Sequence, residues 1–214
     1  MILQMLTVGS LATNCYLVGC PQTNEAAVID PGGDADFILG EARRLGLKIT
    51  QIILTHGHFD HIAALRAVHE ASGAPIAIHP DDAPMLTNPL RSFAFWMGSL
   101  QPSPPADVLL NAGDVVRIGG TVQLSVRHVP GHSPGGIALV TTGVVFSGDA
   151  LFAGSIGRTD FPGGNYRQLI ASIRSQLLTL PDDTVVYPGH GPLTTIGEER
   201  RYNPFLQSEQ PELG

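Results

Sequence analysis

Residues 55–61 read Thr55-His56-Gly57-His58-Phe59-Asp60-His61 and place three imidazoles and one carboxylate within six positions. The segment follows the pattern of a buried strand over 49–55 and precedes apolar residues at helical spacing that continue to the break at 73–75. The motif is therefore predicted to lie on a strand-to-helix loop. Packing gives few reasons to cluster imidazoles, whereas histidine and aspartate commonly bind transition metals. The motif predicts a metal site.

The spacing within the motif predicts two adjacent sites. If the backbone stays extended, His56 and His58 project the same way, because side chains two residues apart share a face. The turn into the helix can then aim Asp60 and His61 at a second point close by.

Further ligands are needed, because a zinc ion completes its coordination shell with His, Asp, Cys or solvent. His132, Asp149 and His190 each follow a predicted strand and lie among glycines, where a loop can bring a side chain to a metal. A lone histidine in a turn is usually structural, and aspartate after glycine usually stabilises a turn. Together with the first motif, these three residues are better explained as ligands.

The rest of the chain predicts one domain over residues 1–214. We expect strands at 2–8, 14–20, 25–30 and 184–187, with short strands between 106 and 149. Helices are expected at 34–46, from residue 60 or 61 to 72, at 167–179 and at 197–203. The proline-rich and aromatic stretch 88–106 is either a loop over the site or an ordinary surface excursion.

Charge and hydropathy exclude several partners. The formal net charge is −7 and the chain has no run rich in lysine and arginine, which argues against nucleic acid and anionic membranes. The opening residues lack a basic region before a long apolar core, and no stretch is long enough to span a bilayer. We therefore expect a cytoplasmic protein. The sequence leaves the oligomeric state open.

The motifs His-x-His-x-Asp-His, Gly-His-Ser-Pro-Gly, Ser-Gly-Asp and Pro-Gly-His, in this order, resemble those of the metallo-β-lactamase superfamily. The resemblance implies an α+β fold, a four-layer αβ/βα sandwich with the site at one edge of the two sheets. It assigns ligands position by position: His56, His58 and His132 to one metal, Asp60, His61 and His190 to a second, and Asp149 as a bridge.

The closer resemblance is to small bacterial proteins of the glyoxalase II group, through residues 148–152, 157–165 and 189–200. It implies hydrolysis of S-D-lactoylglutathione or a related acyl-thiol thioester by a metal-bridging hydroxide. Asp60 would be the catalytic proton acceptor, and Arg158 would bind the substrate. Two divalent ions are implied, zinc first, with iron or manganese as alternatives. Arg158 pairing locally with Asp160 is the competing interpretation.

Two departures weaken the substrate assignment. The chain ends near the point where larger glyoxalase II enzymes begin a helical domain that contacts glutathione, and Gly191 follows His190 where those enzymes usually carry glutamate. Residues 157–161 and the tail also resemble persulfide dioxygenases, which use a single iron; His56, His132 and Asp149 would then be its ligands. A β-lactamase would usually carry cysteine at position 149.

Three histidines remain outside the predicted ligand set. His69 lies in a predicted helix, His79 follows a short strand, and His128 lies on the strand that leads to His132. We expect packing, capping or hydrogen-bonding roles for them, with His128 the best candidate for supporting a ligand.

Overall fold

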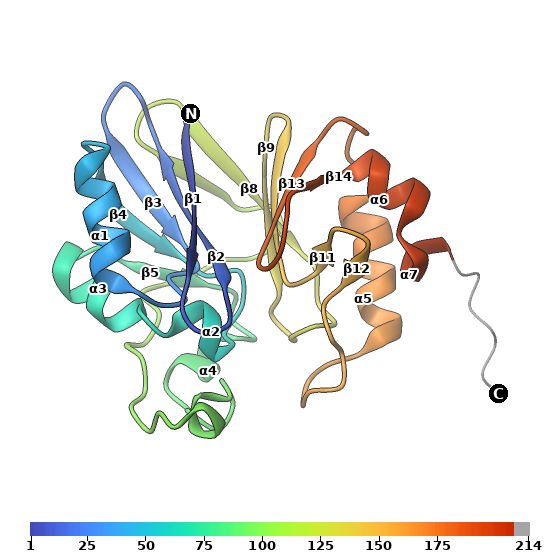
Figure 1. Cartoon of the computed structure of the whole chain (residues 1–214), viewed down its shortest axis with the longest axis horizontal. Coiled ribbons are helices and arrows are strands. Elements are labelled where there is room, and N and C mark those ends of the chain that lie inside the picture. Colours follow the sequence, from blue (N-terminus) through green and yellow to red (C-terminus); the bar gives the residue numbers. More distant parts are fainter. Residues whose placement is uncertain (208–214) are drawn as a thin grey trace.

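The computed structural model describes residues 1–207, which form two six-stranded sheets packed face to face between helices (Figure 1). The first sheet has the order β1-β2-β3-β4-β5-β6, with strands at Ile2–Val8, Thr13–Gly19, Glu25–Ile29, Lys48–Ile53, Ile76–Ile78 and Val108–Leu109. β1 to β3 pair antiparallel, whereas β3 to β6 run parallel. Parallel neighbours require crossovers, and helices α1 (Ala35–Arg44) and α3 (Leu65–Ser72) lie in two of them.

The second sheet has the order β14-β13-β10-β9-β8-β7. Its strands, from β7 to β10 and then β13 and β14, are Val115–Ile118, Val122–His128, Ile137–Thr141, Val144–Gly148, Val185–Pro188 and Thr194–Thr195. β10 and β13 are parallel, and their crossover contains the hairpin β11 (Leu151–Phe152) and β12 (Ser155–Ile156) and then helix α5 (Tyr166–Ser172). Helices α6 (Ile196–Tyr202) and α7 (Pro204–Gln207) follow.

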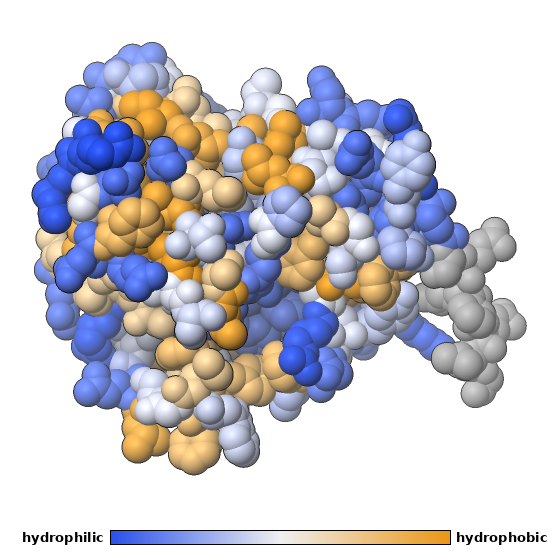
Figure 2. Space-filling model, viewed as in Figure 1, coloured by the Kyte–Doolittle hydropathy of each residue, from blue (hydrophilic) through white to orange (hydrophobic). Residues whose placement is uncertain are grey.

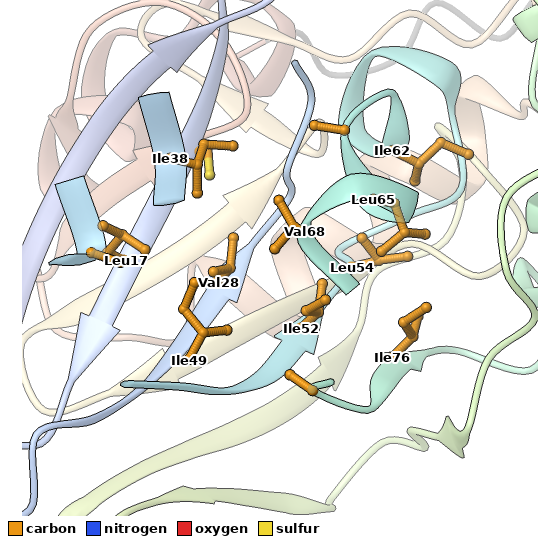
Figure 3. Close-up of a cluster of buried hydrophobic side chains, with 14 of the residues drawn as sticks. Leu17, Val28, Ile38, Ile49, Ile52, Leu54, Ile62, Leu65, Val68 and Ile76 are labelled. Atoms are coloured by element: carbon orange, nitrogen blue, oxygen red, sulfur yellow. The ribbon is translucent and has the colours of Figure 1, made fainter. Parts of the chain in front are cut away.

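Three apolar cores join the layers. One lies between the first sheet and helices α1 and α3, where Leu17, Val28, Ile52, Leu65 and Val68 are buried (Figure 3). The second fills the space between the sheets and includes Tyr16, Ile53, Leu124 and Phe146. The third packs the second sheet on α5 and α6 through Val145, Leu169 and Ile196. The four-layer αβ/βα sandwich implied by the resemblance is confirmed (Figure 1).

The predicted helix from residue 60 or 61 to 72 is wrong as a single element. Helix α2 (Phe59–Ile62) ends early and α3 begins at Leu65. The N–H of Ala64 donates to the carbonyl of Pro31 at 2.9 Å, a contact outside the helix, and this diverts the backbone. The predicted helix at 167–179 is α5 followed by a π-helical turn over Ile173–Leu177.

The stretch 88–106 lies beyond α4 (Ala83–Leu86) and contains only a 3₁₀ turn over Ala94–Met97. Its apolar side chains divide into two groups: Ala94 is buried, whereas Trp96 is 73% exposed and Leu100 is 72% exposed. Apolar side chains reach the surface at the lower end of the molecule, where this stretch runs (Figures 1 and 2). Within residues 1–207, no helix is long and apolar enough to cross a membrane.

Candidate metal centre

The polar side chains of the first sheet gather at the ends of three neighbouring parallel strands. Asp30 follows β3, His56 and His58 follow β4, and Asp82 follows β5. Because the carboxyl ends of parallel strands meet at one edge of a sheet, these residues come together there. Asp149 and His190 follow the parallel pair β10 and β13 in the second sheet. The two edges face each other, so both halves of the chain contribute to one centre.

Three ring nitrogens converge on a first point. His132 Nε2 lies 2.9 Å from His58 Nδ1 and 3.3 Å from His56 Nε2. All three side chains are buried. A tetrahedral ion with bonds of about 2.05 Å places its ligand atoms about 3.3 Å apart. The spacing therefore suits three imidazoles around one transition-metal ion.

A second group forms beside the first. His190 Nε2 lies 2.9 Å and His61 Nε2 lies 3.6 Å from the same oxygen of Asp60, Oδ2. Asp149 lies between the groups: one of its oxygens is 3.3 Å from His61 Nε2, and the other is 3.6 Å from both His132 Nε2 and His190 Nε2. The structure thus brings all seven predicted ligand residues together, and places Asp149 where a bridging carboxylate would lie.

The electrostatics of the first group suit a cation. Burial lowers the pKa of His56 well below its usual value, with further contributions from His61 and His58, and burial together with His132 lowers the pKa of His58 to about 3. These imidazoles are therefore neutral, the form that ligates metal.

The second group carries the carboxylates. Burial opposes ionisation of Asp60, but the hydrogen bond from His190 and the nearby His61 hold the pKa of Asp60 below its ordinary value. His61 Nε2 and Asp149 Oδ1 are buried and have no hydrogen-bond partner among residues 1–207. Unsatisfied buried polar atoms are costly, and a shared ion would satisfy both. The residues present therefore fit two divalent metal ions.

Two buried carboxylates that sequence reasoning missed hold the motif in place. Asp30 accepts hydrogen bonds from the N–H of Thr55 at 2.7 Å and from Nδ1 of His61 at 2.9 Å. Asp82 accepts from the N–H of Gly57 at 3.1 Å and from that of Gly135 at 2.6 Å, so it ties the first motif to the loop that carries His132. The sequence signal that could have identified Asp30 and Asp82 is their position shortly after the strands β3 and β5.

The second sheet is fixed to the first beside His190. Asn14, at the start of β2, donates from its side chain to the carbonyls of Pro188 at 3.0 Å and Gly191 at 2.9 Å, and its N–H donates to Gly189 at 2.7 Å. A Cβ on Gly189 would lie 2.1 Å from Asp149 Oδ1, so only glycine lets this loop pass the metal centre. The Pro-Gly-His motif is therefore explained by close packing as well as by ligation.

The metal centre opens into a cavity of about 480 Å³, which Arg158, Phe161, Phe152 and Leu11 help to line. His132 Nδ1 donates to the carbonyl of Arg158 at 2.8 Å, so the backbone of Arg158 orients a predicted ligand. The guanidinium makes two hydrogen bonds to Asp160, at 2.8 and 2.7 Å, and stacks on Phe161 at 3.8 Å. Arg158 therefore lines the cavity, as expected for a substrate-binding residue, and also pairs with Asp160, as the competing interpretation predicted.

Part of the 88–106 stretch forms a wall of this centre. The ring of Phe93 lies 5.2 Å from that of His58 and 4.5 Å from that of Phe161. Phe93 has a left-handed backbone with φ of 65°, which is costly for a residue with a bulky side chain. The N–H of Phe59 donates to the carbonyl of Ser92 at 2.7 Å, which fixes this wall to the metal motif.

The three remaining histidines lie outside the seven-residue cluster. Nδ1 of His69 donates to the carbonyl of Ala74, and Nε2 of His128 donates to the carbonyl of Pro134, on the loop that carries His132. His79 and His128 gather with Asp81, but their rings are stacked at 4.1 Å and 8°. Parallel stacked rings cannot direct their in-plane lone pairs at one ion, so this group is a poor metal site.

Comparison with known proteins identifies the family. The model of the metallo-β-lactamase superfamily matches residues 8–190, and the chain belongs to that superfamily, whose members bind divalent metals. The chain is therefore placed among the metal-binding hydrolases. One relative, hydroxyacylglutathione hydrolase GloC of Haemophilus influenzae, is 37% identical over 98% of this chain and 100% of its own length.

Solved structures agree on the fold. The B3 metallo-β-lactamase BLEG-1 has a TM-score of 0.91 and 41% identity, covering 97% of this chain and 100% of its own. TTHA1623, solved in a di-iron-bound form, has a TM-score of 0.83 and 42% identity, covering 95% and 100%. ETHE1 from Myxococcus xanthus has a TM-score of 0.80 and 35% identity, covering 95% and 84%.

Proposed function

We propose that the protein hydrolyses acyl-thiol thioesters, with S-D-lactoylglutathione as the candidate substrate. The observation that carries this proposal is the pair of candidate ligand groups that share Asp149, which lines one open cavity. The full-length similarity to hydroxyacylglutathione hydrolase GloC supports the choice of thioester. The acidic net charge supports a small-molecule substrate over nucleic acid or a membrane.

Two divalent ions, which we propose to be zinc with iron or manganese as alternatives, would supply a hydroxide at neutral pH and polarise the thioester carbonyl. The protein itself would supply the metal ligands and the group that accepts the proton of the attacking hydroxide. Asp60 Oδ2 lies at the cavity surface, 2.9 Å from His190 and 3.4 Å from the hydroxyl of Thr13. We assign Asp60 as the group that accepts the proton released after attack.

A second candidate is the persulfide dioxygenase reaction with a single iron. It is favoured by the closeness of His56, His132 and Asp149, since His132 Nε2 lies within 3.6 Å of the facing atoms of both other residues. The predicted second group, Asp60, His61 and His190, would then have no role, yet its ligand atoms, like those of the first group, all lie within 4.8 Å of one another. The hydrolase is therefore the better account.

The two candidates are separated by metal content and by substrate. We expect the purified protein to bind about two transition-metal ions per chain, and to cleave S-D-lactoylglutathione without consuming oxygen. Elemental analysis, release of free thiol and an oxygen electrode with glutathione persulfide measure these properties on one sample. If the protein holds a single iron and takes up oxygen with glutathione persulfide, the hydrolase proposal is wrong and the dioxygenase is the function. Hydrolysis of a β-lactam but not of thioesters would also contradict the proposal.

Arg158 is proposed to bind the anionic thiol carrier at the rim of the cavity. Arg158→Ala should raise KM for a glutathione thioester about 5-fold to 10-fold with a smaller change in kcat, because the contact lies away from the reacting carbonyl and binds ground and transition states alike. Initial-rate kinetics on a variant shown to keep its metals check this. An unchanged KM would mean that Arg158 only braces the loop by its pair with Asp160.

A further inference from the structure

A second cavity of about 310 Å³ lies next to the metal-site cavity. The adjacent residues Phe161 and Pro162 line one cavity each, and Phe93, whose ring contacts that of Phe161 at 4.5 Å, lines the second one. The rest of its lining is mainly apolar, from Pro84, Met85, Leu90 and Pro134. Phe93 and Phe161 are thus in contact and form a wall between the two cavities.

The second cavity contains one cation, Arg91. No ion pair of its guanidinium is found within residues 1–207, and the side chain is exposed. Arg158, on the other side of the wall, already makes two hydrogen bonds to Asp160. Asp81 also lines the second cavity, with its carboxylate 3.7 Å from His79. Of the two arginines beside this wall, Arg91 is therefore the one that has no carboxylate partner within residues 1–207.

The position of Arg91 is set by the metal motif. Asn88 caps the turn by accepting from the N–H groups of Leu90 at 3.1 Å and Arg91 at 3.4 Å. The next residue, Ser92, is buried and accepts the N–H of Phe59 at 2.7 Å. Phe59 directly precedes Asp60. A ligand that reaches Arg91 is therefore held in a fixed relation to the metal centre.

We propose that the second cavity binds the distal end of the thiol carrier and that Arg91 selects carriers with a second carboxylate. This inference rests on the proposed thioesterase function. With the thioester at the metal centre, the carrier would pass over the wall of Phe93 and Phe161, with one anionic group near Arg158 and another at Arg91. An arginine binds a carboxylate through two parallel hydrogen bonds, which gives it preference over neutral groups. A dianionic peptide thiol such as glutathione has this chemistry.

The test combines a variant with a modified substrate. S-D-lactoylglutathione is compared with its two monoesters, each of which neutralises one carboxylate of the carrier, in the wild type, Arg91→Ala and Arg91→Gln. We expect one monoester to lose about 10-fold in kcat/KM with the wild type and little or nothing with either variant, because the partner of that carboxylate is already gone. Arg43→Ala, on the solvent side of α1, should behave like the wild type.

The possible failures are distinguishable. If the wild type cleaves no thioester, the proposed function is wrong. If it cleaves S-D-lactoylglutathione but each monoester loses the same factor with the wild type and with both Arg91 variants, the function stands and the assignment of Arg91 is overturned. Because Arg91 is exposed and its backbone contacts remain, both variants should keep the melting temperature of the wild type.

Discussion

Replacing Asp149 with alanine should remove metal from both sites and lower the rate of thioester hydrolysis by about 10³-fold or more. Its two oxygens face His61 on one side and His132 and His190 on the other, so both sites lose a ligand. Metal ions supply several kcal/mol of transition-state stabilisation, and about 4 kcal/mol corresponds to a factor of 10³ in rate. Metal content by elemental analysis and kcat/KM for S-D-lactoylglutathione are the measurements.

His190→Ala is the matched comparison, because His190 belongs to only one ligand group. It should empty mainly the second site and leave the first site, held by His56, His58 and His132, close to full occupancy. Circular dichroism establishes that both variants are folded. Equal metal loss from both sites in the His190 variant would contradict the division of ligands into two groups.

Asp82→Ala should have the second large effect, although Asp82 is not a predicted ligand. The substitution leaves the N–H groups of Gly57 and Gly135 without their acceptor, and each such buried loss costs about 1–3 kcal/mol. The loops that carry His58 and His132 would no longer be tied together. Removing an interaction that orients ligands lowers metal affinity by about 10-fold to 100-fold.

Denaturant unfolding of the metal-free protein and metal titration of the folded protein measure the two effects of the Asp82 substitution separately. Asp81→Ala is the control, since Asp81 is exposed and makes no hydrogen bond to the metal loops within residues 1–207. If Asp82→Ala binds metal as the wild type does, the carboxylate does not organise the first site. The control should leave both the free energy of unfolding and metal affinity unchanged.

The seven residues that the structure gathers could be predicted from the sequence because their signal is local. The heptapeptide at 55–61 combines a strand end, a helix start and four metal-binding side chains, and each of these is readable from neighbouring residues. His132, Asp149 and His190 carry the same kind of signal, a ligand among glycines after a strand. The close packing of Gly189 against Asp149 gives that pattern its physical reason.

The hydrogen bonds by which Asp30 and Asp82 hold the ligand loops could not be predicted, because they depend on which strands become neighbours. Asp30 lies 25 residues before Thr55, and Asp82 lies 53 residues before Gly135, yet both pairs are joined by hydrogen bonds. The helix break at Ala64 has the same origin, since its N–H bonds to Pro31. The helical spacing of apolar residues does not show that a carbonyl from a distant turn, here that of Pro31, will compete for a backbone N–H.

The sequence by itself determined which residues can bind metal, because side-chain chemistry is a property of short segments, and the order of its motifs carried the resemblance that implied the family and the fold class. The tertiary structure alone decided which carboxylates, Asp30 and Asp82, orient those residues. It also placed Phe93 beside His58 and put Arg91, which has no ion pair within residues 1–207, in the next cavity. Those features depend on the parallel register of the strands and on loop packing, in which contacts between residues far apart in the chain set distances that no local pattern encodes.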